Sequence, residues 1–477
     1  IGVKPLYYAR IPGALLFASE IKAILAHPSI SPRLDFGAFL DYLTFVSTPA
    51  PATLFEGIRK LRPGTFLRMD GHGEIREETY WDAILPGRLE EVPEEEICAE
   101  ILRLLESAVR KRMMSDVPFG VYLSGGVDSS ANVALMSRMM DRPVTTFSVG
   151  FEGQPAYNEL EEARHVAALF GCDHHEVVLS ARDLQETVPD LIHHQDEPIA
   201  DWFFGPLYHL ARLTRKSGTV VVQVGEGSDE QFFGYPGYLS VYGMERRYGG
   251  PLRSLPAPLR RALHGSAAFL ARALERGGDR LDLLRCAASD ETSFWGGAIA
   301  FKGEEKREIL SDSARRRGNG LDSYRVVADF WDRIRREKPE SDFGERMVYL
   351  ELKQRLAELL LMRVDKMTMA AGVEARVPFL DHRLVEYTMR IPTDLKIRGG
   401  VSKHLLKKAL SGVLPGEVLH RPKRGFGAPV SEWFAGELYR FAEDSILTSR
   451  IREIDLRMVD LAAERVSAWV LQESRMQ

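Results

Sequence analysis

The hydrophobic and polar residues follow two different patterns along the chain. Residues 1 to about 80 alternate short apolar segments with glycine and proline turns, as in LRPGTFLRMDGHGEI. The Pro63-Gly64 dipeptide and the GHG tip at Gly71 to Gly73 are typical of hairpin punctuation. This part is therefore predicted to be rich in β-strands.

From residue 97 to about 235, apolar runs alternate with helical periodicity. The predicted order is helix 101–112, strand 119–123, a helix from Ser129, strand 145–151, helix 159–170, strand 174–179, helices through 215 and strand 219–224. Continuous apolar strands separated by helices indicate a parallel sheet covered on both faces. We expect an α/β fold with a doubly wound parallel sheet, whose ligands bind at the carboxyl ends of the strands. Residues 240–477 are predicted to be predominantly helical.

A boundary is expected where the chain becomes acidic and loses its period, between Leu85 and Glu96 (LPGRLEEVPEEE). Such a composition suits a linker between domains. The chain has 477 residues, and single hydrophobic cores stop growing near ~250 to 300 residues. We therefore predict two domains, residues 1–85 and 97–477.

Charge and cysteine content restrict the partners and the compartment. The formal net charge of -5 leaves no basic excess for a nucleic-acid backbone. No apolar run approaches the ~18 residues of a membrane helix, so neither nucleic acid nor membrane is an expected partner. Cys98, Cys172 and Cys286 lack metal-ligand spacing and indicate free thiols in a reducing compartment. We expect a cytoplasmic protein.

The motif SGGVDSS at residues 124–130 follows an apolar strand directly and opens a helix. Unpaired backbone N–H groups and the helix dipole converge on an anion in this arrangement. Gly125 and Gly126 would let the backbone approach a phosphate. A plain glycine-serine cap is the alternative, but the whole motif at a strand end favours a pyrophosphate loop. The lysine of the GxxxxGK[ST] loop is missing, which argues against a kinase-like or GTPase-like site. The expected hydroxyl donors are Ser124, Ser129 and Ser130.

A second glycine turn, in VVVQVGEGSDEQFFGY at residues 220–235, carries three carboxylates: Glu226, Asp229 and Glu230. Carboxylates beside a triphosphate repel it unless a cation intervenes, so they indicate Mg²⁺ held by oxygen ligands together with the phosphates. Asp128 on the first loop and Asp229 on the second are the predicted metal ligands. An acidic solvated turn is the alternative.

These motifs resemble a known group of enzymes. SGGxDSS resembles the pyrophosphate loop of the N-type ATP pyrophosphatases, which include asparagine, GMP, NAD and argininosuccinate synthetases. The second motif resembles the GEGSDE or GDGGDE stretch of asparagine synthetases, and residues 359–387 are similar to the same family. The resemblance implies that ATP is bound and that Glu226 helps an acyl-adenylate form. Adenine is expected against the strand ends, near Leu123, Val149 and Gly225.

Basic residues occur in VSKHLLKKAL and in LHRPKRGFGAPV. Arg421, Lys423 and Arg424 could neutralise charge on a leaving pyrophosphate, but composition alone favours a solvated helix and loop. The family resemblance implies that Lys403 contacts the phosphates during adenylation. Charged residues between 359 and 387 lie in an apolar setting, where ion pairs are at least as probable as substrate contacts, and we assign them no chemistry. These are Glu374, Arg376 and Asp381.

The beginning of the chain, GVKPLYY followed by LLFASEIKAILAHP, resembles the closing part of an N-terminal-nucleophile glutaminase domain. The family's glutaminase uses an N-terminal cysteine, whereas this chain begins with Ile1. We interpret residues 1–85 as a remnant of a class II amidotransferase domain in a fragment that lacks the nucleophile. None of the three cysteines is expected to replace it.

The predicted function is ATP-dependent amide formation through an acyl-adenylate. The expected reaction converts aspartate, ATP and ammonia to asparagine, AMP and diphosphate, with ammonia drawn from glutamine in the complete protein. The expected partners are these small molecules, and a homodimer is left open. One alternative amidates or cyclises another carboxylate, as in β-lactam, lasso-peptide, surface-polysaccharide or secondary-metabolite chemistry; the stretch Asp196–Pro206 should lie at that pocket. The other is a non-catalytic nucleotide-binding module.

Overall fold

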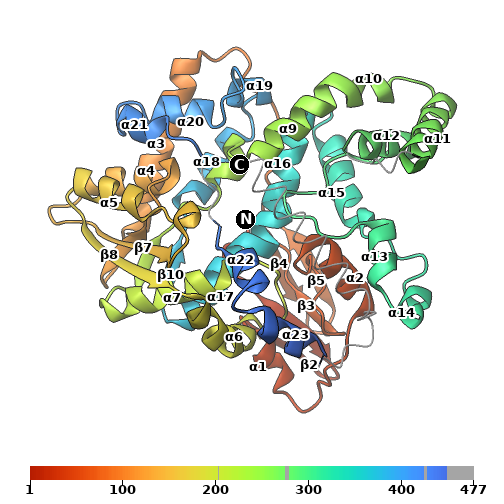
Figure 1. Cartoon of the computed structure of the whole chain (residues 1–477), viewed down its shortest axis with the longest axis horizontal. Coiled ribbons are helices and arrows are strands. Elements are labelled where there is room, and N and C mark those ends of the chain that lie inside the picture. Colours follow the sequence, from red (N-terminus) through yellow and green to blue (C-terminus); the bar gives the residue numbers. More distant parts are fainter. Residues whose placement is uncertain (202, 274–278, 424–426, 448–477) are drawn as a thin grey trace.

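A five-stranded parallel sheet forms the core of the α/β part of the molecule, at the left of Figure 1. The computed structural model describes residues 1–201, 203–273, 279–423 and 427–447. The strand order is β10-β9-β6-β7-β8, and every neighbouring pair is parallel. The strands are β6 Phe119–Tyr122, β7 Thr145–Phe151, β8 Asp173–Leu179, β9 Val221–Gln223 and β10 Glu374–Arg376.

Side chains alternate across this sheet into two separate hydrophobic clusters. Tyr122 and Val222 pack into one cluster, and Val121 and Leu123 pack into the other. A sheet that is buried on both faces needs apolar residues at consecutive positions, which explains the continuous apolar runs. The helices that follow the strands are α4 Val127–Ser137, α5 Leu160–Leu169, α6 Ala181–Gln195 and α7 Phe204–Lys216. The α/β class predicted from the sequence is confirmed.

The predicted strand 145–151 has the predicted bounds, and the one predicted at 219–224 is shorter. The sequence prediction missed β10, which lies within the resemblance segment 359–387. Glu374 pairs with Val221 and Arg376 with Gln223. A three-residue segment with a charge at each end has no strand signature of its own, because its conformation is set by pairing with β9.

The N-terminal segment contains a three-stranded sheet of order β2-β1-β3 and a separate hairpin. These strands are β1 Tyr7–Ile11, β2 Ala14–Ala18, β3 Ile58–Lys60, β4 Thr65–Met69 and β5 Ile75–Thr79. The hairpin turns where the GHG tip predicted it. Helices α1 Ile21–Leu25 and α2 Phe36–Phe45 were not predicted. The α2 sequence, FGAFLDYLTF, is an apolar run that periodicity alone cannot assign to helix or strand.

The acidic run predicted as linker ends in a helix. Helix α3, Glu94–Arg112, takes its first turn from three consecutive glutamates, where negative charge complements the helix dipole. Glu94 pairs with Lys408 at 2.8 Å and with His404 at 2.9 Å. The irregular chain between the two parts therefore ends at residue 93, before the predicted Glu96.

The second half of the chain is mainly helical in the part that the structure describes, and residues 448–477 of the predicted helical region lie outside it. The helices are α8 Ser228–Phe232, α9 Pro236–Met244, α10 Gly250–Arg253, α11 Ala257–Ala273, α12 Asp279–Ser289, α13 Gly303–Ile309, α14 Asp312–Arg317, α15 Tyr324–Glu337, α16 Phe343–Lys353, α17 Leu361–Ala370, α18 His382–Thr388, α19 Thr393–Lys396, α20 His404–Ala409, α21 Gly416–Leu419, α22 Val430–Ala435 and α23 Tyr439–Leu447. A π-helical turn, Leu356–Leu360, leads into α17.

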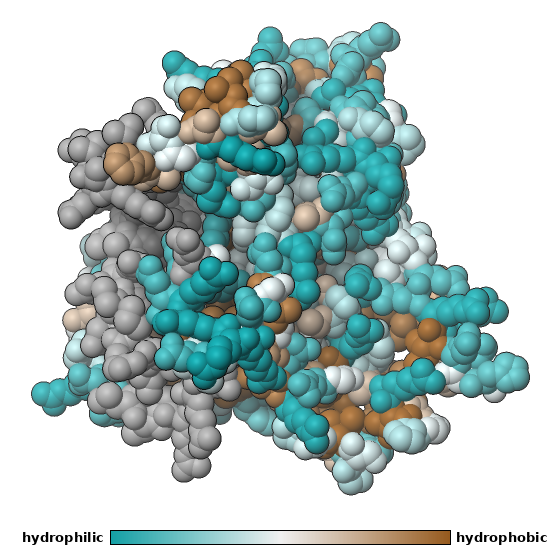
Figure 2. Space-filling model, turned by 90° about the vertical axis from the view of Figure 1, so that its right-hand side faces the viewer, coloured by the Kyte–Doolittle hydropathy of each residue, from teal (hydrophilic) through white to brown (hydrophobic). Residues whose placement is uncertain are grey.

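Figure 2 shows the face at the right-hand side of Figure 1. The coloured part of this face is mostly hydrophilic, and its apolar residues form separate groups. Among the described residues, no helix has the length and apolarity needed to cross a membrane.

Candidate active site

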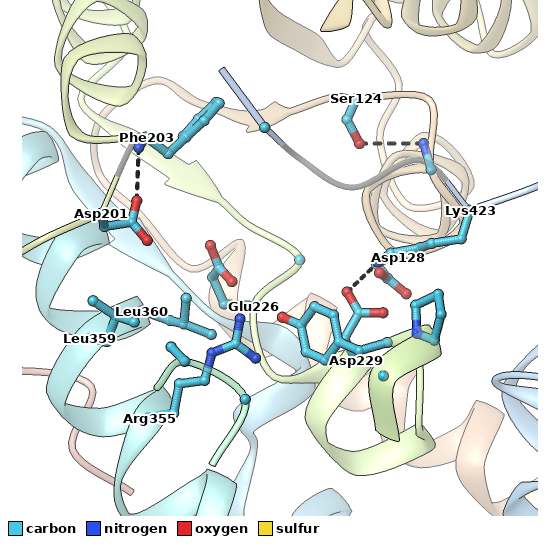
Figure 3. Close-up of a pocket in the computed structure, with 18 of the residues that line it drawn as sticks. Ser124, Asp128, Asp201, Phe203, Glu226, Asp229, Arg355, Leu359, Leu360 and Lys423 are labelled. Carbon is cyan, nitrogen blue, oxygen red and sulfur yellow. Dashed lines mark hydrogen bonds and ion pairs between the residues drawn. The ribbon is translucent and has the colours of Figure 1, made fainter. Parts of the chain in front are cut away.

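Two glycine loops leave the same edge of the sheet from neighbouring strands. β6 and β9 are paired with Phe119 opposite Val221, so the loops after them, residues 123–127 and 224–228, lie side by side. They border a cleft of about 1170 Å³ that is also lined by residues 293–302 and by residues between 355 and 364. Figure 3 shows part of this cleft, with Arg355, Leu359 and Leu360 on one side. The sequence-predicted residues that line it are Leu123, Ser124, Gly125, Gly126, Asp128, Ser129, Val149, Gly225, Glu226, Asp229 and Lys403.

The two glycines of the first loop have different roles. Gly125 has φ +76°, and a Cβ there would lie 2.7 Å from the Glu162 carbonyl carbon, so packing against α5 requires glycine. Gly126 caps α4 with φ −73°, and an added Cβ would meet only Ser124 Oγ, at 3.3 Å. The N-terminus of α4 is thus open to the cleft. A helix N-terminus with free N–H groups favours an anion.

Ser130 is placed differently from the other two predicted hydroxyl donors. It is fully buried, its Oγ has no hydrogen-bond partner among the described residues, and it is not among the residues that line the cleft. Ser124 and Ser129 do line it, with their hydroxyl oxygens 3.2 Å apart. Two of the three predicted donors therefore face the cleft.

A cluster of opposite charges joins the two loops. Lys403 Nζ lies 2.5 Å from Asp128 Oδ2 and 2.5 Å from Asp229 Oδ1, and Lys423 Nζ lies 2.5 Å from Asp229 Oδ2. Burial disfavours the Lys403 ammonium, but the two carboxylates outweigh it and raise the pKa of Lys403. Burial also opposes ionisation of Asp229, and Lys403 with Lys423 nonetheless holds its pKa below the ordinary range. Lys403 and Asp229 therefore stay charged near neutral pH.

Local backbone geometry brings Lys403 to this position. Lys403 precedes α20 in the left-handed region, φ +56°, and its N–H donates to Phe232 O at 3.1 Å. Such a conformation is strained for a residue with a side chain and persists only where its surroundings hold it. A Cβ on Gly234 would overlap Asp229 Oδ1 and Lys403 Cε. Gly234 therefore leaves room for the ion pair, a role that sequence reasoning missed.

Asp128 and Asp229 suit a divalent cation by donor type. Both offer carboxylate oxygens on the cleft, and both contact one ammonium group, so the two carboxylates lie close together. Among the described residues, no cluster of three His, Cys, Asp or Glu side chains could hold a metal ion. Mg²⁺ is commonly bound through one or two carboxylates plus substrate phosphates. The residues present fit that arrangement.

Glu226 lies farther along the cleft and belongs to a second charge cluster. Arg363 Nη2 donates to Glu226 Oε1 at 3.1 Å, and Arg363 Nη1 lies 3.0 Å from Asp201 Oδ1. Burial raises the pKa of Glu226, although Arg363 opposes the shift. Asp201 also accepts from the Phe203 N–H at 2.8 Å (Figure 3).

Sequence reasoning did not identify Arg363 or Asp201. Asp201 lies in the stretch 196–206 that was expected at the substrate pocket, and Ala200, Asp201 and Phe203 do line the cleft. Residue 202 is outside the described residues. The sequence signals for Arg363 were its place in the segment 359–387, which resembles the asparagine synthetases, and its position directly after four apolar residues, where a charge needs a partner.

The expectation of a solvated basic loop was wrong for two of its residues. Arg421 donates to Gly125 O at 3.1 Å, and Lys423 pairs with Asp229. Composition shows that a loop is basic but not which carboxylates it folds against. Arg424 lies outside the described residues.

Glu374, Arg376 and Asp381 form ion pairs and are not among the cleft-lining residues. Glu374 pairs with Arg376 at 3.0 Å, and Asp381 pairs with Arg112 at 3.2 Å and with Arg383 at 2.9 Å. This geometry supports the structural interpretation.

The three cysteines are unpaired thiols. Burial raises the pKa of each of Cys98, Cys172 and Cys286 to about 11. Because the thiolate is the nucleophile, such thiols are poorly reactive near neutral pH.

Comparisons with known proteins cover nearly the whole chain. The family model described as asparagine synthase matches residues 100–476, and the one described as a glutamine amidotransferase domain matches residues 1–81. Asparagine synthetase [glutamine-hydrolyzing] 1 of Bacillus subtilis is 32% identical over 94% of this chain and 68% of its own length. A putative asparagine synthetase of Mycobacterium bovis is 32% identical over 97% and 68%. Amidase chyE of Penicillium rubens is 27% identical over 95% and 70%.

Proposed function

The chain belongs to the asparagine synthetase family, and we propose that its cleft adenylates the side-chain carboxylate of aspartate with ATP and passes the acyl group to ammonia. The observation that carries this proposal is the contact of one lysine, Lys403, with Asp128 and Asp229, which follow the two glycine loops in the first turns of α4 and α8. This contact brings together, at one edge of the sheet, a helix N-terminus that could bind phosphate, two carboxylates that could bind a metal ion, and the lysine ammonium.

The phosphate end of the cleft would bind the triphosphate of the substrate ATP. The open N-terminus of α4 and the hydroxyls of Ser124 and Ser129 face this space. Asp128 and Asp229 would hold Mg²⁺ with phosphate oxygens, and the ion would neutralise charge on the phosphates. Lys403, which neutralises both carboxylates in this structure, would then be available to the departing pyrophosphate.

The other end would present the carboxylate. An oxygen of the carboxylate attacks the α-phosphorus, and pyrophosphate leaves with the electron pair. Ammonia then attacks the acyl carbon, and AMP leaves as the amide forms and a proton is lost. A free carboxylate would have to expel oxide, whereas its adenylate expels AMP. Glu226 lies between Asp201 and Asp229 (Figure 3). We therefore propose that it helps to position the substrates and to balance charge during adenylation.

We also propose that the chain consists of two functional parts, with the boundary between them in residues 85–97. The amidotransferase match at residues 1–81 supports glutamine as the source of ammonia in the complete protein, and the synthase match at 100–476 supports the remainder as the ligase.

The products distinguish this chemistry from that of other ligases. Incubation with ATP, Mg²⁺, aspartate and ammonium chloride should release pyrophosphate and AMP, measured by coupled assay and chromatography. An acyl-phosphate ligase would give ADP and phosphate, and ADP as the main product would refute the adenylation proposal.

A second candidate differs only in the carboxylate. The cleft of about 1170 Å³ is also lined by residues 293–302, and its volume exceeds the ~300–1,000 Å³ that encloses one drug-sized ligand. This volume leaves room for a carboxylate larger than aspartate. If pyrophosphate forms only with a larger carboxylate in a substrate panel, the adenylation mechanism stands, and the larger carboxylate replaces aspartate as the assigned substrate.

A further inference from the structure

Lys60, at the end of β3 in the N-terminal segment, is a buried charge outside the cleft. Its side chain is 5% exposed, and its Nζ lies 2.9 Å from Glu197 Oε1 and 3.3 Å from Glu358 Oε2. The same ammonium donates to Thr48 O. Burial disfavours its charge, but the two glutamates outweigh burial and raise its pKa. The lysine is thus a permanent cation between two carboxylates from distant parts of the chain.

Each of these glutamates begins a short segment that ends in the cleft. Glu197 precedes Asp201 by four residues, and Glu358 precedes Arg363 by five, across the π-helical turn into α17. Asp201 and Arg363 then meet at 3.0 Å. The two segments are therefore joined at both ends, by the ion pairs of Lys60 at one end and by the ion pair between Arg363 and Asp201 at the other. We call this closed arrangement the ring. π-Helical turns occur often at functional sites.

A second set of contacts ties the same loop to the N-terminal segment. The Asp196 side chain is 1% exposed, accepts from the Ile21 N–H at 3.0 Å and pairs with Lys22 at 2.9 Å. It also pairs with Lys366 of α17. At the other end of the loop, the Ala200 N–H donates to Val46 O at 2.8 Å. The loop 196–201 is thus held in place by contacts with residues between 21 and 60 of the N-terminal segment.

We propose that Lys60 is a positioning residue for the synthetase reaction. It holds Glu197 and Glu358, these fix Asp201 and Arg363, and Arg363 fixes the carboxylate of Glu226 at 3.1 Å. The inference rests on the proposed role of Glu226. It means that the amidotransferase-like segment shapes the synthetase cleft even when ammonia is supplied directly.

The experiment compares charge-balanced variants of the full chain. Lys60→Met alone leaves two buried carboxylates without a cation and destabilises the fold. The triple variant Lys60→Met/Glu197→Gln/Glu358→Gln removes all three charges. Its matched control is Lys338→Met/Glu345→Gln, a lysine and glutamate 3.1 Å apart, 2% and 1% exposed, that are not cleft-lining residues.

With ammonium chloride, the triple variant should lose about 10- to 100-fold in kcat/KM for the carboxylate, because small displacements of a positioned group cost this much. Its KM for ATP should stay within about twofold of wild type, and the control should keep both values, since a merely structural loss would not separate the substrates. Unchanged kcat/KM for the carboxylate in a folded triple variant would overturn the proposal.

Amide hydrogen exchange separates this inference from the proposed function. If wild type forms no pyrophosphate with any carboxylate, the proposed function fails, and the ring is tested by its effect on structure. Faster exchange at residues 197–201 and 359–363 in the triple variant than in the control would support positioning by Lys60. Equal exchange in the two proteins would refute it.

Discussion

The two ends of the cleft both depend on buried charges, yet they differ in how those charges respond to protons. At the phosphate end, the pKa of Asp229 is lowered and that of Lys403 is raised, so these two charges are fixed. The neighbouring Glu230 is not part of this pair, and burial raises its pKa to about 7. At the other end, burial raises the pKa of Glu226 in spite of Arg363. The Asp229–Lys403 pair is therefore a constant electrostatic clamp, whereas Glu226 at the other end can change protonation. The difference suits the proposed phosphate site, which would always bind a polyanion, beside a proposed carboxylate site whose charge can change.

The largest effect should come from breaking the clamp. Lys403→Met removes the cation shared by Asp128 and Asp229 and the positive charge available to pyrophosphate. We expect kcat for pyrophosphate release to fall about 10²- to 10³-fold, as for the loss of a preorganised charge-stabilising donor. Lys408→Met is the control, because Lys408 pairs with Glu94 and Glu95 away from the cleft. A Lys403→Met enzyme with a kcat within a few-fold of wild type would contradict the clamp.

A second prediction separates the two glycines of the phosphate loop. Gly126→Val should preserve the fold and raise the Kd for ATP at least tenfold, because an added Cβ meets only Ser124 Oγ and the position lines the cleft. Gly125→Val should instead lower the melting temperature, since φ +76° and contact with Glu162 strain the loop by about 1–3 kcal/mol. Calorimetric titration and thermal denaturation measure the two effects. Equal ATP affinity in folded Gly126→Val would remove the phosphate-loop assignment.

The contrast between the ends also explains what could be predicted from sequence. The phosphate end is formed by short contiguous motifs, in which strand, glycine turn and helix start follow each other, so Ser124 to Ser129 and Asp229 could be placed in advance. The other end is assembled by tertiary contacts. Arg363 meets Asp201 across 162 positions and Glu226 across 137, and no local pattern encodes such a pairing.

The same limit applied to the fold. Long apolar runs such as Thr145–Phe151 identified the central strands because both faces of the sheet are buried. β10 could not be found in this way, because Glu374–Arg376 becomes a strand only by pairing with β9. The inward fold of Lys423 onto Asp229 was missed for the same reason.

The third prediction concerns Arg363. Arg363→Met should raise KM for the carboxylate and lower its kcat/KM about 10- to 100-fold, with little change in KM for ATP, because Arg363 contacts Asp201 and Glu226 but not the phosphate cluster. Removing one partner of a buried pair also destabilises by about 3–5 kcal/mol. The double variant Arg363→Met/Asp201→Asn should recover part of that stability without recovering kcat/KM. Recovery of both would reduce Arg363 to a structural role.

The smallest expected effect is the most specific test of the comparison between the two ends, because it shows which end of the cleft changes its protonation with pH. A glutamate whose pKa is raised in the folded protein loses its ionised form as pH falls through a value above the ordinary 4.5. The fixed charges of Asp229 and Lys403 do not change between about pH 5 and 9. At constant free ammonia, kcat/KM for the carboxylate should therefore decline on the acid side with an apparent pKa above 4.5.

Two variants test this acid limb. Arg363 opposes the rise in the pKa of Glu226, so Arg363→Met should move the limb to higher pH, and Glu226→Gln should abolish it in the residual activity. An acid limb unchanged in Glu226→Gln would assign the titrating proton to another group, and the two ends would no longer differ in the way that their surroundings predict.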